Sequence, residues 1–162
     1  MAQDFLLPAE KLGQSLQHLG LRLVLAESCT GGGLAQAVTD VPGSSAWFDR
    51  GFVTYSNASK SEMLGVQQAT LIEHGAVSEA TALEMVNGAL LHSHAELAFA
   101  VTGIAGPEGG SAEKPVGTVF IAWQLRDQTA QCIKKHFAGD RLSVRQQVIG
   151  YCLQQACDVL AA

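Results

Sequence analysis

Two short apolar runs, each followed at once by a glycine-rich segment, constrain the fold of this chain most strongly. Residues 21–26 lead into Glu-Ser-Cys-Thr and three glycines at 31–33, and residues 97–102 lead into a second glycine-rich stretch at 103–110. Each run is too short for an ordinary helix and has no polar face, as in the buried strands of parallel sheets. Ligands bind beyond the carboxyl ends of such strands, so we expect both glycine-rich segments at one edge of a sheet.

The remaining patterns predict an α/β fold with a mixed sheet. Helical spacing is found in residues 8–19, 34–39, 66–74, in the segment after Ser78 and in residues 142–160. Further strands are expected at 46–54, 116–125 and 129–137. The last two strands flank a short turn, as in a hairpin, so an antiparallel pair joins the parallel strands. No linker or repeat divides residues 1–162, and we therefore expect a single domain.

The composition argues against nucleic-acid, membrane and metal-binding functions. The net charge is −5 with ten Lys and Arg, whereas nucleic-acid binders usually present a basic face. No apolar run approaches the roughly 20 residues of a membrane-spanning helix, and the first residues lack a basic leader, so we expect a cytoplasmic protein. The four cysteines form no Cys-x-x-Cys pair and the five histidines show no zinc-ligand spacing, so we expect no metal.

The segment ESCTGGG at residues 27–33 is the strongest candidate for chemistry. A strand, a tight polar turn and a helix in succession leave backbone N–H groups unpaired at the helix start, where they favour negative charge. Ser28 or Cys29 could be a nucleophile beside an oxyanion hole, or the turn could hold a phosphate. A simpler interpretation is a helix cap followed by closely packed glycines. The spacing fits neither a P-loop, a dinucleotide fingerprint nor a Ser-x-x-Lys motif.

Polar residues follow three of the predicted strands and would converge if those strands are neighbours. Ser28 follows the first, Tyr55 and Lys60 the second, and Thr102 the third. A serine nucleophile needs a base, and Lys60 can serve if burial lowers the pKa of its amine toward neutrality. Tyr55 could relay a proton or hold the lysine. Alternatively, Lys60 is a surface residue that binds an anion, and Cys29 is a small buried hydrophobic residue.

Five motifs stand in order along nearly the whole chain. They are AESCTGG at 26–32, PGSSAWF at 42–48, GFVTYSN at 51–57 with Lys60, HGAVSE at 74–79, and TGIAGP at 102–107 with KPVGTV at 114–119. Together they closely resemble the CinA C-terminal domain family, specifically its stand-alone bacterial nicotinamide mononucleotide deamidases. The resemblance implies a three-layer α/β/α fold with a mixed, mostly parallel sheet of about five strands. It also implies an amidohydrolase that converts nicotinamide mononucleotide to nicotinate mononucleotide and ammonia in pyridine nucleotide recycling.

The resemblance further implies roles for individual residues. Ser28 would be the nucleophile, with Lys60 as base and Tyr55 nearby. The oxyanion would lie against the backbone N–H groups of Cys29, Thr30 and Gly31. Candidate substrate contacts, assigned by residue type, are Ser44, Ser45, Thr102, Gly103, Gly106, Arg141 and Arg145. No cofactor is implied.

Several alternatives remain open at this point. The chain could be a nucleotide-binding module without chemistry, or an amidase for a different small amide. The competence label attached to the family suggests a DNA-associated protein, against which the acidic balance argues. We also expect a homodimer, for which Trp47 and Phe48 would suit the contact.

Overall fold

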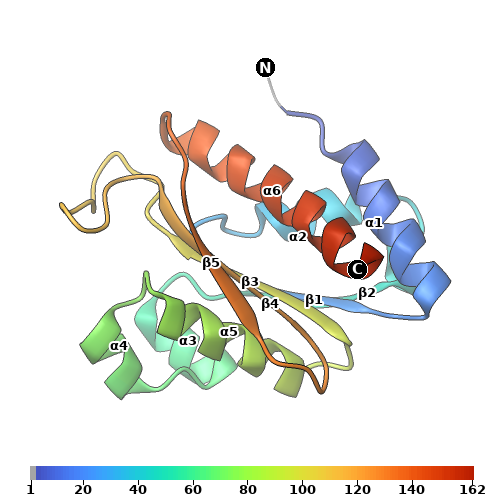
Figure 1. The fold of residues 1–162 in the computed structure, drawn as a ribbon, viewed down its shortest axis with the longest axis horizontal. Coiled ribbons are helices and arrows are strands. Elements are labelled where there is room, and N and C mark those ends of the chain that lie inside the picture. Colours follow the sequence, from blue (N-terminus) through green and yellow to red (C-terminus); the bar gives the residue numbers. More distant parts are fainter. Residues whose placement is uncertain (1–2) are drawn as a thin grey trace.

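A mixed sheet of five strands lies between two layers of helices in the computed structural model, which describes residues 3–162 (Figure 1). Residues 1–2, part of the N-terminal stretch in which we expected no leader, lie outside the described residues. The strands are β1 Leu23–Glu27, β2 Phe48–Val53, β3 Leu97–Gly103, β4 Thr118–Leu125 and β5 Gln131–His136. Their order is β2-β1-β3-β4-β5, with β1 parallel to β2 and β3, and β4 antiparallel to β3 and β5. Only β4 among these strands runs against the others, which confirms the predicted mixed, mostly parallel sheet.

The helices divide between the two faces of the sheet (Figure 1). One face is covered by α1 Leu6–Leu19, α2 Gly33–Thr39 and α6 Arg141–Ala161. The other face is covered by α3 Asn57–Leu64, α4 Gln68–His74 and α5 Glu79–Leu91. A short 3-10 helix, η1 Ser44–Ala46, precedes β2. The predicted three-layer α/β/α architecture is therefore confirmed.

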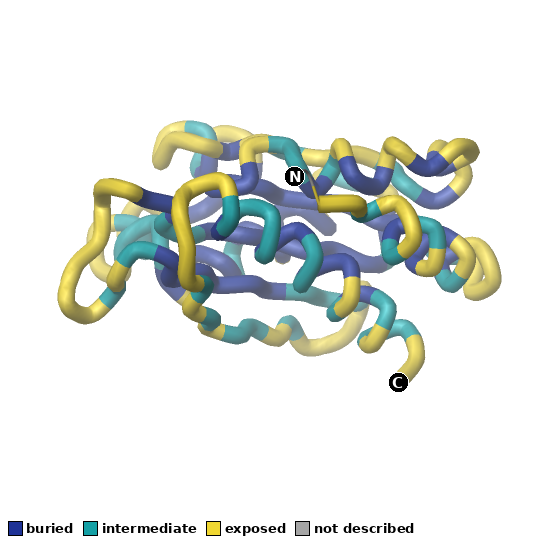
Figure 2. The backbone as a smooth tube through the Cα atoms, turned by 90° about the horizontal axis from the view of Figure 1, so that it is seen from above, coloured by how far each residue is buried: buried dark blue, intermediate teal, exposed yellow. Residues whose placement is uncertain are grey.

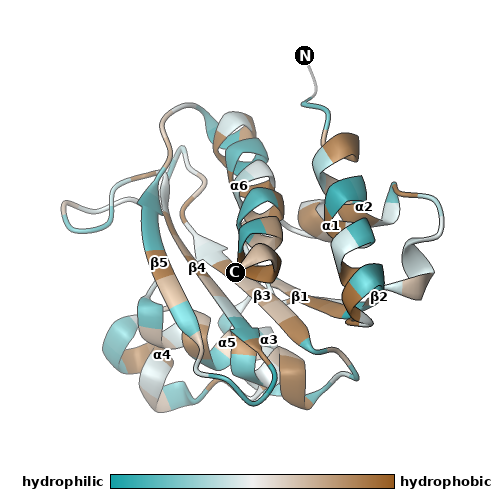
Figure 3. Cartoon of the chain, turned by 45° about the vertical axis from the view of Figure 1, so that its right-hand side comes forward, coloured by the Kyte–Doolittle hydropathy of each residue, from teal (hydrophilic) through white to brown (hydrophobic). Residues whose placement is uncertain are grey.

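The alternation of side chains along β1 explains why both faces of the sheet must be covered. Leu23 and Leu25 belong to the core beneath α1, α2 and α6, whereas Val24 and Ala26 belong to the core beneath α3, α4 and α5. Successive side chains of a strand point to opposite faces, so an apolar run needs a helix layer on each side. Figure 2 shows the strands as mostly buried segments, and Figure 3 shows hydrophilic residues along β5 at the edge of the sheet.

Side-chain caps fix where the two helices that carry basic site residues begin. The Ser56 hydroxyl accepts the Ser59 N–H at the start of α3, and the Asp140 carboxylate accepts the Ser143 N–H at the start of α6. Such caps satisfy donors that a helix cannot satisfy internally. They place Lys60 in the first turn of α3 and make Arg141 the first residue of α6.

Two expectations, about the start of β1 and about Trp47 just before β2, need correction. β1 begins at Leu23, because the Leu21 N–H donates to Leu16 O and completes the turn that ends α1. Trp47 is 2% exposed and packs against Gly13 of α1, where a Cβ would overlap the indole ring. A buried indole cannot form the contact that we expected of it between two copies of the chain. The homodimer itself stays a prediction.

Candidate active site

Ser28 and Lys60 meet at the C-terminal end of β1. Ser28 directly follows this strand, and its N–H donates to Val101 O of β3 at 3.0 Å. Lys60 reaches the same point from α3, and its side chain is 1% exposed. Lys60 Nζ donates to Ser28 Oγ at 3.0 Å and to Thr54 O at 2.8 Å. A hydroxyl and an amine that are 32 positions apart therefore share a buried hydrogen bond.

The surroundings of the Lys60 amine favour its neutral form. Its two hydrogen-bond partners are a hydroxyl and a carbonyl, neither of which carries a negative charge. Burial lowers the pKa of Lys60 below its ordinary value of 10.5, and the proximity of Cys29 opposes this shift only in part. A neutral amine can accept the serine proton, as a general base must. The interpretation of Lys60 as a surface residue is wrong, because the side chain is buried.

Cys29 has the properties of a core residue rather than of a nucleophile. It is 6% exposed and packs in the core beneath α1, α2 and α6. Burial raises the pKa of its thiol to about 12. The thiolate is the reactive form of cysteine, so this sulfur is protonated and inert near neutral pH.

A cavity of about 270 Å³ opens beside the Ser28–Lys60 pair. Its walls come from the ends of β1 and β3, from Ala76 and Val77 before α5, and from Arg141 at the start of α6. The loop that follows β3 contributes residues 103–106, 108 and 109. The two glycine-rich segments therefore meet at one edge of the sheet, as their positions after apolar strands predicted.

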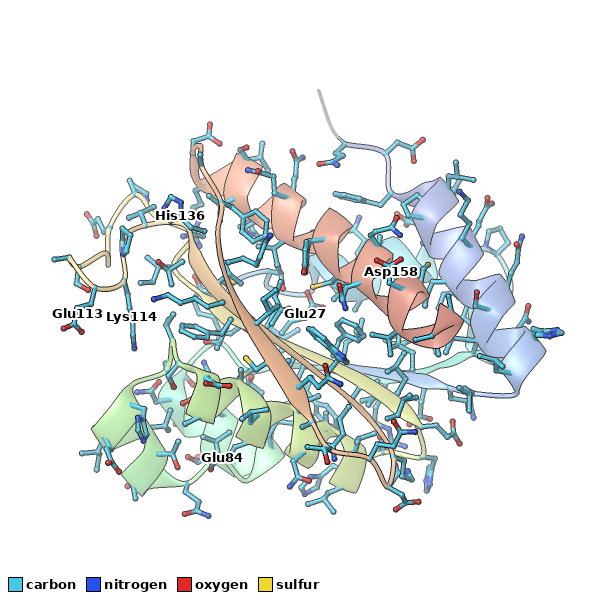
Figure 4. All side chains as sticks on the ribbon, viewed as in Figure 1. Glu27, Glu84, Glu113, Lys114, His136 and Asp158 are labelled. Atoms are coloured by element: carbon cyan, nitrogen blue, oxygen red, sulfur yellow. The ribbon has the colours of Figure 1, made fainter. Side chains whose placement is uncertain are left out.

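Glu27, the last residue of β1, caps α2 through its side chain. The carboxylate is 1% exposed and lies between the sheet and the helix layer that contains α6 (Figure 4). Its Oε1 accepts the Leu34 N–H at 2.8 Å and the Thr30 hydroxyl at 2.6 Å, and its Oε2 accepts the Ala35 N–H at 2.9 Å. The negative charge also complements the positive end of the helix.

The first turn of α2 consequently has no N–H group left for a phosphate. Besides the two donors held by Glu27, the Gly33 N–H donates to Thr30 O and the Gln36 N–H to Gly32 O, both at 2.9 Å. Glycine turns that bind phosphate offer these helix donors to the ligand. Here a buried carboxylate takes that position, so the interpretation of this turn as a phosphate site is wrong.

Of the three residues whose N–H groups were predicted to hold the oxyanion, Cys29 alone is among those that border the cavity. The Gly31 N–H donates to Ser28 O at 3.0 Å and closes a tight turn, which removes it from the predicted set. For the N–H groups of Cys29 and Thr30, no carbonyl, carboxylate or hydroxyl acceptor is found within residues 3–162. Thr30 is fully buried and does not border the cavity, so the Cys29 N–H, which directly follows Ser28, is the donor placed to meet an oxyanion formed there.

Tyr55 and Arg141 form the rim of the cavity. Arg141 donates through Nη2 to the Tyr55 hydroxyl and through Nη1 to Gly106 O, each at 2.9 Å. Tyr55 is 60% exposed, and its hydroxyl forms its hydrogen bond with this arginine rather than with Lys60. The structure thus brings Tyr55 to the site without a hydrogen bond to the lysine.

The other predicted substrate contacts are divided between the cavity and the rest of the molecule. Thr102 and Gly103 border the cavity, with the Thr102 hydroxyl donating to Ala76 O at 2.7 Å. Arg145 lies behind the turn, where its Nη2 donates to Thr30 O at 3.1 Å. Arg145 is therefore placed to support the turn and does not border the cavity.

Ser44 and Ser45 lie at the N-terminal ends of the parallel strands, opposite the end where Ser28 lies, and are not part of this site. Ser45 O accepts Arg22 Nη2 at 3.2 Å, and the Leu23 N–H at the start of β1 donates to Trp47 O. Because β1 and β2 are parallel, residues that precede β2 lie beside the start of β1, one strand length from Ser28. Their assignment as substrate contacts is thereby corrected.

The sequence and the fold agree on the family of this protein. The model of the CinA C-terminal domain matches residues 7–160. The chain belongs to this family. Among curated proteins, "Nicotinamide-nucleotide amidohydrolase PncC" of Escherichia coli K12 is 51% identical over 146 residues, which cover 90% of this chain and 88% of the relative. The protein of the same name from Pseudomonas putida is 49% identical over 141 residues, which cover 87% of this chain and 88% of the relative.

Solved structures of the CinA family share the whole fold. The "competence/damage inducible protein CihA" of Agrobacterium tumefaciens is 44% identical and has a TM-score of 0.94. The match covers 100% of this chain and 98% of the CihA chain. A CinA superfamily protein of Klebsiella pneumoniae is 38% identical, with a TM-score of 0.94. The match covers 98% of this chain and 99% of that protein.

Two features of this CinA domain escaped sequence reasoning. Glu27 belongs to the ESCTGGG segment, but its role as a cap depends on the N–H groups of Leu34 and Ala35, seven and eight positions later. The only signal was a carboxylate at the end of an apolar run, just before glycines. Lys114 was not singled out: its Nζ donates to His74 O at 3.1 Å and ties the loop after β3 to the end of α4 (Figure 4).

The CinA domain offers no ligand set for a metal within residues 3–162, where no three His, Cys, Asp or Glu side chains are grouped suitably. Over the same residues, no helix is long and apolar enough to cross a membrane.

Proposed function

We propose that this CinA-family protein is an amidohydrolase that converts nicotinamide mononucleotide to nicotinate mononucleotide and ammonia, as a step in pyridine nucleotide recycling. The observation that carries the proposal is the buried hydrogen bond between Lys60 Nζ and Ser28 Oγ, in which the lysine has no anionic partner. The names of relatives about half identical over most of the chain support the choice of substrate.

In the proposed reaction, Ser28 Oγ attacks the carboxamide carbon while Lys60 accepts its proton. The carbonyl oxygen becomes an oxyanion against the Cys29 N–H. Lys60 returns the proton to the departing nitrogen, the C–N bond breaks, and ammonia leaves an ester on Ser28. Water then attacks this ester while Lys60 accepts a proton from it, and Lys60 returns that proton to Ser28 Oγ as the C–O bond to Ser28 breaks and the acid leaves. Thr54 O holds the amine in place through both stages.

Arg141 is the proposed partner of the substrate phosphate. Both of its present acceptors, the Tyr55 hydroxyl and Gly106 O, are neutral, so its full charge remains available to an anion at the rim. Tyr55 and the backbone near Gly106 keep the guanidinium facing the cavity. In this arrangement Tyr55 acts on substrate binding rather than on the proton of Ser28.

Ammonia release tests the proposal. Wild-type protein and Ser28→Ala are compared with nicotinamide mononucleotide, nicotinamide riboside, free nicotinamide and a panel of unrelated amides. We expect turnover of the mononucleotide by the wild type and a loss of about 10³-fold or more in Ser28→Ala. Calorimetric titration of Ser28→Ala should still show mononucleotide binding. Binding without any ammonia from the wild type would instead identify a nucleotide-binding module, and turnover of another amide alone would change the substrate.

A further inference from the structure

We propose that Glu27 is a positioning residue for this reaction: its carboxylate holds the turn that carries Ser28 and the Cys29 N–H at the cavity. The inference rests on the proposed role of Ser28, but it does not depend on which amide is cleaved. Glu27 faces α2 and is not among the residues that border the cavity. Its effect on the reaction must therefore pass through the turn.

Thr30 is the link between the buried carboxylate and the proposed oxyanion hole. Its hydroxyl donates to Glu27 at 2.6 Å, and its carbonyl accepts the Gly33 N–H and Arg145 Nη2. Thr30 is fully buried and takes part in three hydrogen bonds, so it fixes the turn in which Ser28 and the Cys29 N–H directly precede it. Oxyanion stabilisation depends on donors that are already oriented when the charge develops.

A carboxylate suits this position better than its amide isostere does. Three donors converge on the two oxygens of Glu27: the Thr30 hydroxyl and the N–H groups of Leu34 and Ala35. In glutamine, one of these oxygens becomes an NH₂ group, which can only donate. The Thr30 hydroxyl can rotate to accept, but one helix N–H then faces another donor in either orientation of the amide. Glu27→Gln should therefore displace the turn while it keeps the size of the side chain.

Covalent labelling of Ser28 by a fluorophosphonate tests this inference without reference to the natural substrate. Ser28 Oγ attacks phosphorus, fluoride leaves, Lys60 accepts the serine proton, and the phosphonyl oxygen lies where the oxyanion would. The second-order labelling rate is measured by mass spectrometry for wild type and Glu27→Gln. Misplacement of catalytic groups by an ångström costs on the order of 100-fold, so we expect labelling to slow by roughly 10- to 100-fold. The kcat for ammonia release should fall by the same factor, with KM within about twofold.

Glu96→Gln is the matched control. Glu96 Oε2 also accepts a backbone N–H, that of Arg22 at 2.7 Å, but at the opposite edge of the sheet. The same change of charge there should leave both the labelling rate and kcat unchanged. A merely structural role for Glu27 would lower the melting temperature without the matched fall in labelling and kcat.

Thr30→Val keeps the inference testable if Glu27→Gln does not fold. It removes only the hydroxyl that joins Glu27 to the turn and should slow labelling in the same direction, by a smaller factor. If Glu27→Gln folds and is labelled at the wild-type rate, the positioning role is overturned. If Glu27→Gln does not fold, a wild-type labelling rate in Thr30→Val overturns it. No labelling of the wild type would be a different result, because it would remove Ser28 as nucleophile and with it the proposed function.

Discussion

Replacing Lys60 by methionine removes the amine from the site and leaves a side chain of similar length. Lys60 is 1% exposed, so an alanine would open a cavity, whereas methionine fills most of the space. The substitution deletes the hydrogen bonds to Ser28 Oγ and Thr54 O and no others that involve the side chain. Its effect on turnover therefore reports the amine rather than a collapse of α3.

The size of the effect follows from the two tasks proposed for the amine. A positioned general acid or base typically contributes 10²- to 10⁴-fold, which corresponds to about 3–5 kcal/mol at 1.36 kcal/mol per tenfold. Lys60 shares a hydrogen bond with Ser28 Oγ, and it serves both ester formation and ester hydrolysis in the proposed reaction. We therefore expect kcat of Lys60→Met to fall by about 10³-fold or more. Combining it with Ser28→Ala should add little further loss, since the two groups act as a unit.

The pH profile identifies the proton that matters. Burial lowers the pKa of Lys60 below 10.5, and only the neutral amine can accept a proton. Below the folded pKa the amine is protonated, so kcat/KM should fall as the pH decreases through a midpoint lower than 10.5 and level off above it. Lys60→Arg keeps a donor that stays charged at every pH used and should be inactive throughout. Ammonia release is measured with circular dichroism as a check of folding. Retention of more than a tenth of the wild-type kcat by Lys60→Met would refute the role of Lys60 as the base.

Three further substitutions probe the thiol, the rim and the packing of α3. Cys29→Ala should keep kcat within about threefold, because a thiol with a pKa of about 12 is protonated at neutral pH and the backbone N–H is retained; a loss similar to that of Ser28→Ala would contradict this. Arg141→Met should raise KM for the mononucleotide by about tenfold or more and change that for the riboside much less, as steady-state assays of both substrates will show. Gly88→Ala places a Cβ against the backbone carbonyl of Leu64 at the contact of α5 with α3, so urea unfolding should show a loss of about 1–3 kcal/mol.

Most of the fold could be predicted because its strands are buried on both faces. A run such as LAFAVT has no period that distinguishes strand from helix, but its length and the glycines that follow decide in favour of a strand. The prediction failed locally where tertiary contacts set the boundary. Leu21 is apolar but belongs to the turn after α1, and Trp47 lies under a glycine that only the folded chain brings near it.

The sequence indicated which residues border the cavity where strand ends determine this, and failed to do so where strand direction decides. Ser28 directly follows β1 and Thr102 lies at the C-terminal end of its parallel neighbour β3, so both border the cavity. Ser44 and Ser45 have the residue types of a phosphate site, but they precede β2 instead of following it. A parallel strand carries its preceding loop to the other edge, which residue type alone cannot reveal. Hydrogen-bond partners were equally inaccessible, as the pairing of Tyr55 with Arg141 across 86 positions shows.

The use of the α2 start explains why this strand–turn–helix unit is built for chemistry rather than for holding phosphate. An α/β protein that binds phosphate leaves the helix donors and the positive end of the helix dipole to the ligand. Here Glu27 takes both, so an anionic substrate must place its phosphate elsewhere, and Arg141 is the cation that the rim provides. The Cys29 N–H, for which residues 3–162 offer no carbonyl, carboxylate or hydroxyl acceptor, precedes the helix and lies next to the hydroxyl that would attack. In the proposed reaction, the carboxylate would thus separate the place where substrate charge is bound from the place where charge develops.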